Sequence, residues 1–174
     1  MRKRYILTVL LILSFLLTGC GKNPYRAGIK ALEDGEYSKA VTEFQEAIEE
    51  EKNLADSYRG LGIAQWEEEE YEASYQAFEQ ALLEGTEKTA TIYSLMGNCA
   101  METEQYAKAV EVYETALTMK DISEELIKET EFNLIAAYEY AGEVDAAKEK
   151  AAAYIEKYPE DEEVVREAEF LETR

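Results

Sequence analysis

The sequence predicts an all-α protein built as a solenoid of stacked helix pairs, and three observations favour this fold class. A spaced pattern of small and aromatic residues occurs three times: Gly28, Gly35, Tyr37, Ala40, Phe44 and Ala47; Gly62, Tyr71, Ser74, Phe78 and Ala81; and Gly97, Tyr106, Ala109, Tyr113 and Ala116. Successive copies are offset by 34 and 35 residues, a period typical of units that bury their apolar faces against their neighbours. The 174 residues are also rich in good helix formers, with only 9 glycines and 2 prolines.

Composition and charge exclude several classes of function. The chain has 38 acidic and 18 basic side chains, a formal net charge of -20, which repels phosphate backbones and argues against nucleic acid as a partner. It contains no histidine, so the commonest general base and the commonest metal ligand are both missing. It also has no Gly-x-Ser-x-Gly segment. We therefore expect a protein that is not an enzyme and that binds no metal and no cofactor.

The first 19 residues have the pattern of a signal peptide. Three basic residues at positions 2–4 precede an apolar run at 5–17, which is shorter than the roughly 20 residues of a spanning helix and typical of a secretory segment. The run ends in Leu17-Thr18-Gly19-Cys20, which resembles the lipobox of bacterial lipoprotein precursors. That resemblance implies cleavage before Cys20 and a covalent lipid on its thiol. The alternative is an uncleaved anchor or an ordinary signal peptide.

A lipid on Cys20 would place the chain on the extracytoplasmic face of the cell membrane, or on the outer membrane if the cell has one. Residues 20–23 would form a very short tether, because Asn23 is a favoured N-cap and Pro24 a favoured first helical residue. We expect Lys22, Arg26 and Lys30 to face the lipid head groups. The alternative is that they are ordinary solvated cations.

The repeated spacing resembles that of the tetratricopeptide repeat (TPR) family, in which small and aromatic residues alternate at fixed positions of two antiparallel helices. The resemblance implies a right-handed α-solenoid of about four helix pairs over residues 24–159. The repeats would span about 21–54, 55–88, 90–123 and 128–161. The fourth copy departs from the pattern, with Ala151 in place of an aromatic residue and Tyr154 in place of a small one.

Three local features complete the predicted array. Asp121 and Glu124 have the spacing of a capping box, so the first helix of the fourth repeat should begin near Ile122 or Ser123. Residues 160–174 resemble the capping helix that ends such arrays, with apolar side chains at helical spacing at Val164, Val165, Ala168 and Leu171. Cys99 occupies a slot that holds alanine in other repeats, so we expect a buried thiol.

The resemblance also implies a concave groove lined by the first helix of each repeat. Carried over by position, its residues are Tyr25, Ile29, Leu32, Arg59, Ile63, Trp66, Ser94, Asn98, Met101, Phe132 and Tyr140, edged by Glu33, Glu67, Glu102 and Glu139. Tryptophan, arginine and other aromatic residues are enriched at binding hot spots. The alternative is that these side chains only pack between neighbouring helices. The lysine and asparagine clamp of chaperone-binding relatives is missing, which argues against an acidic C-terminal peptide as ligand.

These observations together predict a membrane-anchored, extracytoplasmic, non-catalytic scaffold or assembly adaptor. Its groove would bind a segment of another protein, and its acidic rim would select basic or neutral sequences. The alternative function is that of a receptor for an extracellular peptide.

Overall fold

The computed structural model describes residues 23–120, 122–171 and 173. The signal segment, Cys20 and Lys22 lie outside these described residues. Nine α-helices and no strand are found in the described part of the chain: α2 (Pro24–Glu33), α3 (Tyr37–Glu49), α4 (Leu54–Glu67), α5 (Tyr71–Leu83), α6 (Ala90–Glu102), α7 (Tyr106–Leu117), α8 (Glu124–Tyr140), α9 (Val144–Lys157) and α10 (Glu162–Leu171).

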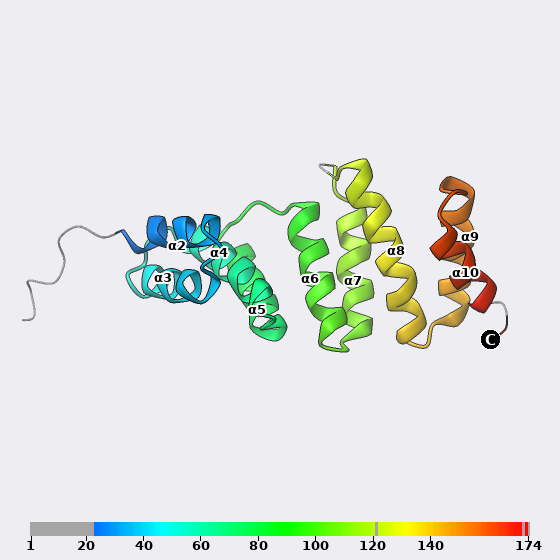
Figure 1. Cartoon of the computed structure of the whole chain (residues 1–174), viewed down its shortest axis with the longest axis horizontal. Helices are drawn as coiled ribbons and strands as arrows, with labels where there is room; N and C mark the ends of the chain where they lie inside the picture. Colours follow the sequence, from blue (N-terminus) through cyan, green and yellow to red (C-terminus); the bar gives the residue numbers. More distant parts are fainter. Residues whose placement is uncertain (1–22, 121, 172, 174) are drawn as a thin grey trace, which may run out of the picture.

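The helices stack in chain order along one axis. Figure 1 shows α2 and α3 at one end and α9 and α10 at the other, and each helix packs on the next one in the sequence. The pairs are α2–α3, α4–α5, α6–α7 and α8–α9, and α10 closes the array against α9. The predicted all-α solenoid of four pairs with a terminal helix is therefore confirmed. Among the helices that the structure describes, none combines the length and the apolar character that crossing a membrane requires.

The repeated glycines allow the two helices of a pair to approach closely. A Cβ atom built on Gly28 would lie 2.8 Å from a ring carbon of Phe44, and one on Gly62 would lie 2.9 Å from a ring carbon of Phe78. Real Cβ contacts are longer than this, so the aromatic ring occupies the space that any larger residue would need. The interlocking of small and large residues that the sequence predicts is confirmed.

The fourth pair reverses this arrangement of small and large side chains. Ile135 stands where the other first helices have glycine, 38 residues after Gly97, and Ala151 stands where the other second helices have an aromatic ring. Both are buried, at 2% and 0% exposed. Tyr154 is also buried, and its hydroxyl donates a hydrogen bond over 3.0 Å to Asp161, the residue before α10. At this level of the fourth pair, the bulky side chain, Ile135, thus comes from the first helix, whereas in the other three pairs it is an aromatic ring of the second helix.

In each of the four pairs, a turn of the same kind joins the two helices. The residues at the turn have left-handed backbone angles, with φ of 71° at Gly35, 61° at Glu69, 58° at Glu104 and 81° at Gly142. In each turn, the next amide donates to a carbonyl five residues back, as Glu70 N does to Gln65 O over 2.8 Å. This hydrogen bond satisfies a carbonyl that the helix end leaves open.

Side-chain caps fix where two of the first helices begin. Asn23 accepts a hydrogen bond from the Arg26 amide over 3.1 Å, and Pro24 is the first residue of α2, as predicted. Helix α8 begins at Glu124, close to the predicted start. Its cap is Ser123, which accepts from the Leu126 amide over 3.2 Å. Asp121, for which a capping box is predicted, lies outside the described residues, and the cap that the structure describes is Ser123.

Buried polar and apolar groups tie the second half of the array together. Cys99 is fully buried, and its thiol donates to the Ser74 hydroxyl over 3.4 Å. Burial raises the pKa of the Cys99 thiol to about 11, so the group stays protonated at neutral pH. This confirms the expected core position. At the end of the chain, Val164 and Leu171 of α10 are 1% and 0% exposed, as the sequence pattern of a capping helix predicts.

Candidate binding groove

The predicted groove residues lie on the first helices of the four pairs, and the structure gathers most of them around three hollows. Tyr25, Ile29 and Leu32 on α2 are half-buried and pack on the core of the first two pairs instead. The hollows are lined by residues of α4, α6 and α8, and their predicted members are Arg59, Ile63, Trp66, Asn98, Met101, Phe132 and Tyr140.

The central hollow has a volume of about 310 Å³ and lies between α4, α6 and α8. Its lining consists of Trp66, Asn98, Met101, Glu102, Tyr113 and Asn133. Trp66 and Met101 are partly buried and pack on the large core cluster, so their remaining surfaces form the apolar part of the hollow. Four of the six residues, Trp66, Asn98, Tyr113 and Asn133, carry uncharged polar groups that can form hydrogen bonds.

A hydrogen-bond network fixes the polar side of the central hollow. The hydroxyl of Tyr113 donates to Asn98 Oδ1 over 2.6 Å, and the Asn133 amide donates to the same oxygen over 3.2 Å. Burial raises the pKa of Tyr113, so its hydroxyl remains a donor. Among the described residues, no hydrogen bond uses the Asn98 amide nitrogen or the Asn133 side-chain oxygen. The network therefore presents one donor and one acceptor, which is what a peptide bond requires of a partner.

Two residues alter the predicted set. Ser94 does not face the groove, because it is only 6% exposed and its hydroxyl is hydrogen-bonded to Thr130 of α8 over 2.9 Å. That contact joins α6 to α8 beneath the surface. Asn133 was not among the predicted residues, although it follows Asn98 by 35 residues. The third and fourth repeats are offset by 38 residues, so Asn133 does not hold the repeat position of Asn98, and position in the repeat could not have found it.

Two aromatic contacts border the groove, one between the helices of the second pair and one between α7 of the third pair and α8 of the fourth. The ring centroids of Trp66 and Tyr71 are 4.9 Å apart. Those of Tyr106 and Tyr140 are 5.1 Å apart and stacked, and Tyr140 remains 62% exposed. Trp66 thus packs against a neighbouring helix and also borders the central hollow. Its role in binding stays a prediction.

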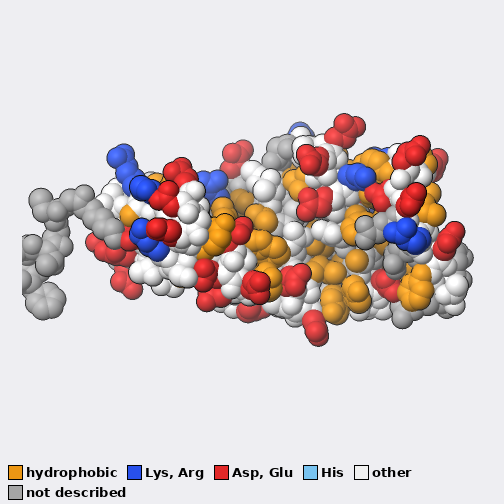
Figure 2. All heavy atoms as spheres, viewed as in Figure 1, with side chains coloured by type: hydrophobic (Ala, Val, Ile, Leu, Met, Phe, Trp, Pro, Cys, Tyr) orange, Lys and Arg blue, Asp and Glu red, His pale blue; other side chains and the backbone are white. Residues whose placement is uncertain are grey.

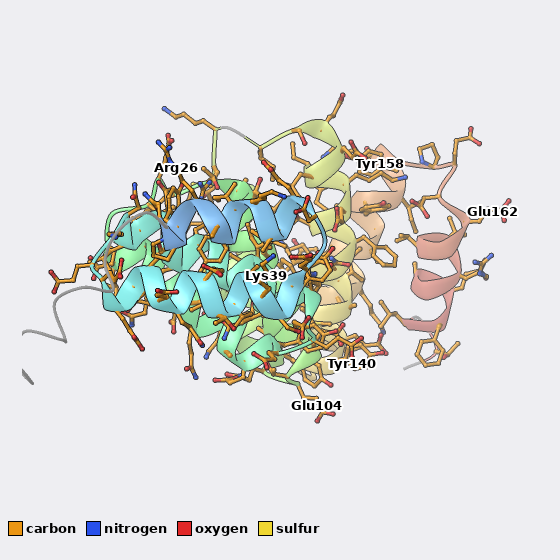
Figure 3. All side chains as sticks on the ribbon, turned by 60° about the vertical axis from the view of Figure 1, so that its left-hand side comes forward. Arg26, Lys39, Glu104, Tyr140, Tyr158 and Glu162 are labelled. Atoms are coloured by element: carbon orange, nitrogen blue, oxygen red, sulfur yellow. The ribbon has the colours of Figure 1, made fainter. Side chains whose placement is uncertain are left out.

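The turns of the second, third and fourth pairs form an acidic edge beside these aromatic rings. We define the acidic edge as Glu67, Glu68, Glu69, Glu70, Glu102, Glu104, Glu139 and Glu143. Residues 66–72, 101–107 and 138–146 contain no lysine or arginine. Figure 2 shows acidic side chains along the lower side of the molecule, and Figure 3 shows Glu104 and Tyr140 close together there. The resulting potential attracts basic segments and repels acidic ones.

The first pair carries basic residues, and one of them, Lys39, follows Ser38, whose hydroxyl donates to Glu68 of the acidic edge over 2.7 Å. Figure 2 shows lysine and arginine side chains at the end of the molecule that α2 and α3 form, and Figure 3 places Arg26 on α2 and Lys39 on α3. Arg26 is exposed, whereas Lys30 is paired with Asp34 over 2.6 Å. Contact of Arg26 and Lys30 with lipid head groups stays a prediction.

The described part of the chain contains no group of three or more cysteine, aspartate and glutamate side chains suited to a metal ion. The site residues found in the structure are therefore aromatic rings, amides and scattered carboxylates. Such groups bind a ligand by contact and hydrogen bonding.

Comparison with known proteins identifies the fold. No family model and no curated protein matches the sequence. Solved structures do match. YrrB, described as a TPR protein with an unusual peptide-binding site, is 22% identical with a TM-score of 0.71, over 83% of this chain and 72% of that chain. A structure of MamA is 15% identical with a TM-score of 0.72, over 85% and 78%. A MamA double mutant is 18% identical with a TM-score of 0.72, over 90% and 86%. At these identities the likeness shows the fold, which is that of a TPR solenoid.

Proposed function

We propose that this chain is a membrane-anchored, extracytoplasmic, non-catalytic scaffold whose groove holds a segment of another protein. The observation that carries the proposal is the central hollow, where the apolar surfaces of Trp66 and Met101 lie beside the amides of Asn98 and Asn133. An extended segment could place an apolar side chain against Trp66 and Met101 and a peptide bond against the two asparagine amides. The acidic edge favours a basic partner.

The lipid anchor rests on the sequence of the signal segment. If Cys20 carries the lipid, only residues 21–23 separate it from Pro24, the start of α2. Three extended residues span about 10 Å, so α2 would lie at the membrane surface and the central hollow two pairs further out. A scaffold of this form would present its partner at a fixed height above the lipid.

One comparison favours the alternative function, a receptor for an extracellular peptide. YrrB, which shares the fold, is described as having a peptide-binding site. The two functions share the same groove and differ in whether the bound segment belongs to a resident protein of the envelope or to a free peptide.

Site-specific crosslinking in living cells tests the groove. A photo-crosslinking amino acid at Met101 should yield a covalent adduct with one defined protein, and the same group at the exposed Glu79 of α5 should not. Asn133→Ala or Trp66→Ala should weaken the interaction by about 2 kcal/mol and reduce the adduct accordingly. Equal adducts from Met101 and Glu79 would contradict a groove-bound partner. An adduct with a small peptide only would favour the receptor.

Metabolic labelling with palmitate tests the anchor separately. The unaltered chain should incorporate label and fractionate with membranes, and Cys20→Ala should abolish the labelling. If the variant is labelled as strongly as the unaltered chain, the lipoprotein assignment is wrong, whatever the crosslinking experiment shows.

A further inference from the structure

The first helices of the second and third pairs stand apart. Helix α2 packs on α4 and α6 packs on α8, whereas α4 and α6 barely touch. The connection between α5 and α6 consists of residues 84–89, and Figure 1 shows it arching over to the start of α6. The result is a hollow of about 570 Å³, which is within the range of ligand pockets in proteins. We call it the α4–α6 pocket.

The walls of the α4–α6 pocket are fixed by hydrogen bonds. The Thr86 hydroxyl of the connection donates to the Ala55 carbonyl at the start of α4 over 3.1 Å. Thr89 accepts from the Ile92 amide over 3.4 Å and caps α6. Both sides of the opening are thus held by the chain itself, so the pocket exists before any ligand arrives.

The lining separates into an apolar part and a charged part. The apolar part consists of Ile63, Phe78, Ile92 and Leu95. Figure 2 shows hydrophobic side chains gathered over the middle of the molecule, where α5 is followed by α6. An apolar side chain placed here would lose its contact with water and gain close contacts with these residues.

The charged part carries more negative than positive groups. It consists of Asp56, Arg59 and Glu87. Arg59 Nη2 lies 2.9 Å from Asp56 Oδ1, and both side chains are about half-exposed. The arginine therefore offsets one carboxylate and leaves the other. An anionic ligand would meet this carboxylate and the field of a chain with net charge -20, whereas a cation would be attracted by both.

We propose that the α4–α6 pocket binds a basic residue and an adjacent aliphatic residue of the partner segment. The aliphatic side chain packs on Ile63, Ile92 and Leu95, and the lysine or arginine head group pairs with Glu87 and Asp56. This inference rests on the proposed function and specifies the partner: its bound segment contains lysine or arginine next to leucine or isoleucine. Arg59 competes with the partner's lysine or arginine for Asp56, and so lowers the affinity of the pocket for that residue.

Fluorescence anisotropy with defined peptides tests the proposal. The probes are three fluorescein-labelled Gly/Ser peptides of equal length with Lys-Leu-Lys-Leu, Glu-Leu-Glu-Leu or Lys-Ser-Lys-Ser at their centres. The protein is the full chain in non-ionic detergent micelles, with empty micelles as the blank. We expect binding of the Lys-Leu peptide, at least about threefold weaker binding of the Lys-Ser peptide, and no binding of the Glu-Leu peptide.

Matched variants separate the pocket from general attraction by an acidic protein. Asp56→Asn with Glu87→Gln should weaken binding of the Lys-Leu peptide about tenfold. Glu46→Gln with Glu111→Gln, which removes the same charge from exposed positions on α3 and α7, should leave the affinity within about twofold.

Two further variants test the pocket itself. Thr91→Phe, which places a ring in the pocket from an exposed position on α6, should also weaken binding of the Lys-Leu peptide, and Arg59→Gln should strengthen it. Circular dichroism melting confirms that each variant is folded.

Three results would overturn the proposal: equal losses in the two double variants, equal affinity for the Lys-Leu and Lys-Ser peptides, or no effect of Thr91→Phe. These results are independent of the crosslinking at Met101. If the pocket variants have no effect while the Met101 adduct forms, the α4–α6 pocket is not the specificity site and the scaffold function stands. If the Met101 adduct is missing, the scaffold function itself fails.

Discussion

The ring of Phe44 lies so close to the backbone of Gly60 that a Cβ atom on Gly60 would fall under 3.0 Å from it. The same ring also contacts Gly28, and it is fully buried. One side chain of α3 is thus held between the backbones of α2 and α4. It joins the first helix pair to the second as well as closing its own pair.

Gly60→Ala should therefore destabilise the protein although alanine is the better helix former. The added methyl group overlaps a fully buried ring, and overpacking of this kind costs about 1–3 kcal/mol, against a gain of about 1 kcal/mol in helix propensity. Urea denaturation measures the net change. Phe44→Leu in the Gly60→Ala background makes room and should return part of the loss. An increase in stability of the single variant would contradict the close approach.

Glu69→Gly and Glu104→Gly should each stabilise the fold by about 1 kcal/mol. Both glutamates have positive φ, 61° and 58°, a conformation that costs a side-chain-bearing residue roughly 1–2 kcal/mol and glycine almost nothing. The converse change, Gly142→Glu at a φ of 81°, should lower the thermal midpoint. If the two glycine variants melt below the unaltered chain, interactions of the carboxylates outweigh the backbone term.

Leu171→Ala should detach the terminal helix. Leu171 is 0% exposed, and truncation of a buried leucine costs about 2–5 kcal/mol. Because a solenoid unit contacts only its neighbours, the loss should concentrate in α8, α9 and α10. Amide hydrogen exchange should show faster exchange there and little change in α2 and α3. Phe170→Ala, at a position that is 49% exposed, is the control and should have a smaller effect.

The protein should lose stability as the pH rises above about 9. Burial raises the pKa of the Cys99 thiol from 9.0 to about 11. The unfolded chain therefore releases this proton first, and the stability that is present below pH 9 is lost between about pH 9 and 11. Burial likewise raises the pKa of Tyr75 to about 12, which extends the loss to higher pH.

Denaturation midpoints between pH 7 and pH 12 measure this alkaline loss. Cys99→Ala, which places in this slot the residue that Ala64 and Ala137 provide in other repeats, should flatten the curve between pH 9 and 11. Identical curves for the variant and the unaltered chain would contradict the thermodynamic role of the thiol. Absorbance at the tyrosinate band, recorded in parallel, should show exposed tyrosines ionising before the buried ones.

Much of the fold could be predicted because its determinants are local or periodic. The 34-residue spacing of Gly28 and Gly62 predicts their close approach to Phe44 and Phe78, and Asn23-Pro24 predicts the start of α2. Gly60 was not predicted as a contact of Phe44, because that contact joins two pairs and depends on the angle between them. The cap at Ser123 was missed because two polar residues near the same helix start compete for one role.

The site could be predicted only in part. Position in the repeat placed Trp66, Asn98 and Met101 on one surface, and the structure gathers them around one hollow. Position in the repeat could not show that Ser94 turns inward to Thr130, because a short hydroxyl side chain can face either the groove or the next helix. The α4–α6 pocket was not predicted, since it results from the path of residues 84–89 and from the separation of two helices.

The reversed pair of the fourth repeat limits how this array can be rebuilt. The first three units share one code, glycine on the first helix against an aromatic ring on the second, so a unit copied or exchanged among them meets a compatible neighbour. Ile135 and Ala151 follow the opposite code. A helix bearing Ile135 set against an aromatic ring would be overpacked, and glycine set against Ala151 would leave a void. The array is thus modular at the end that begins with α2 and α3 and fixed at the other, so duplication can lengthen it only upstream of α8.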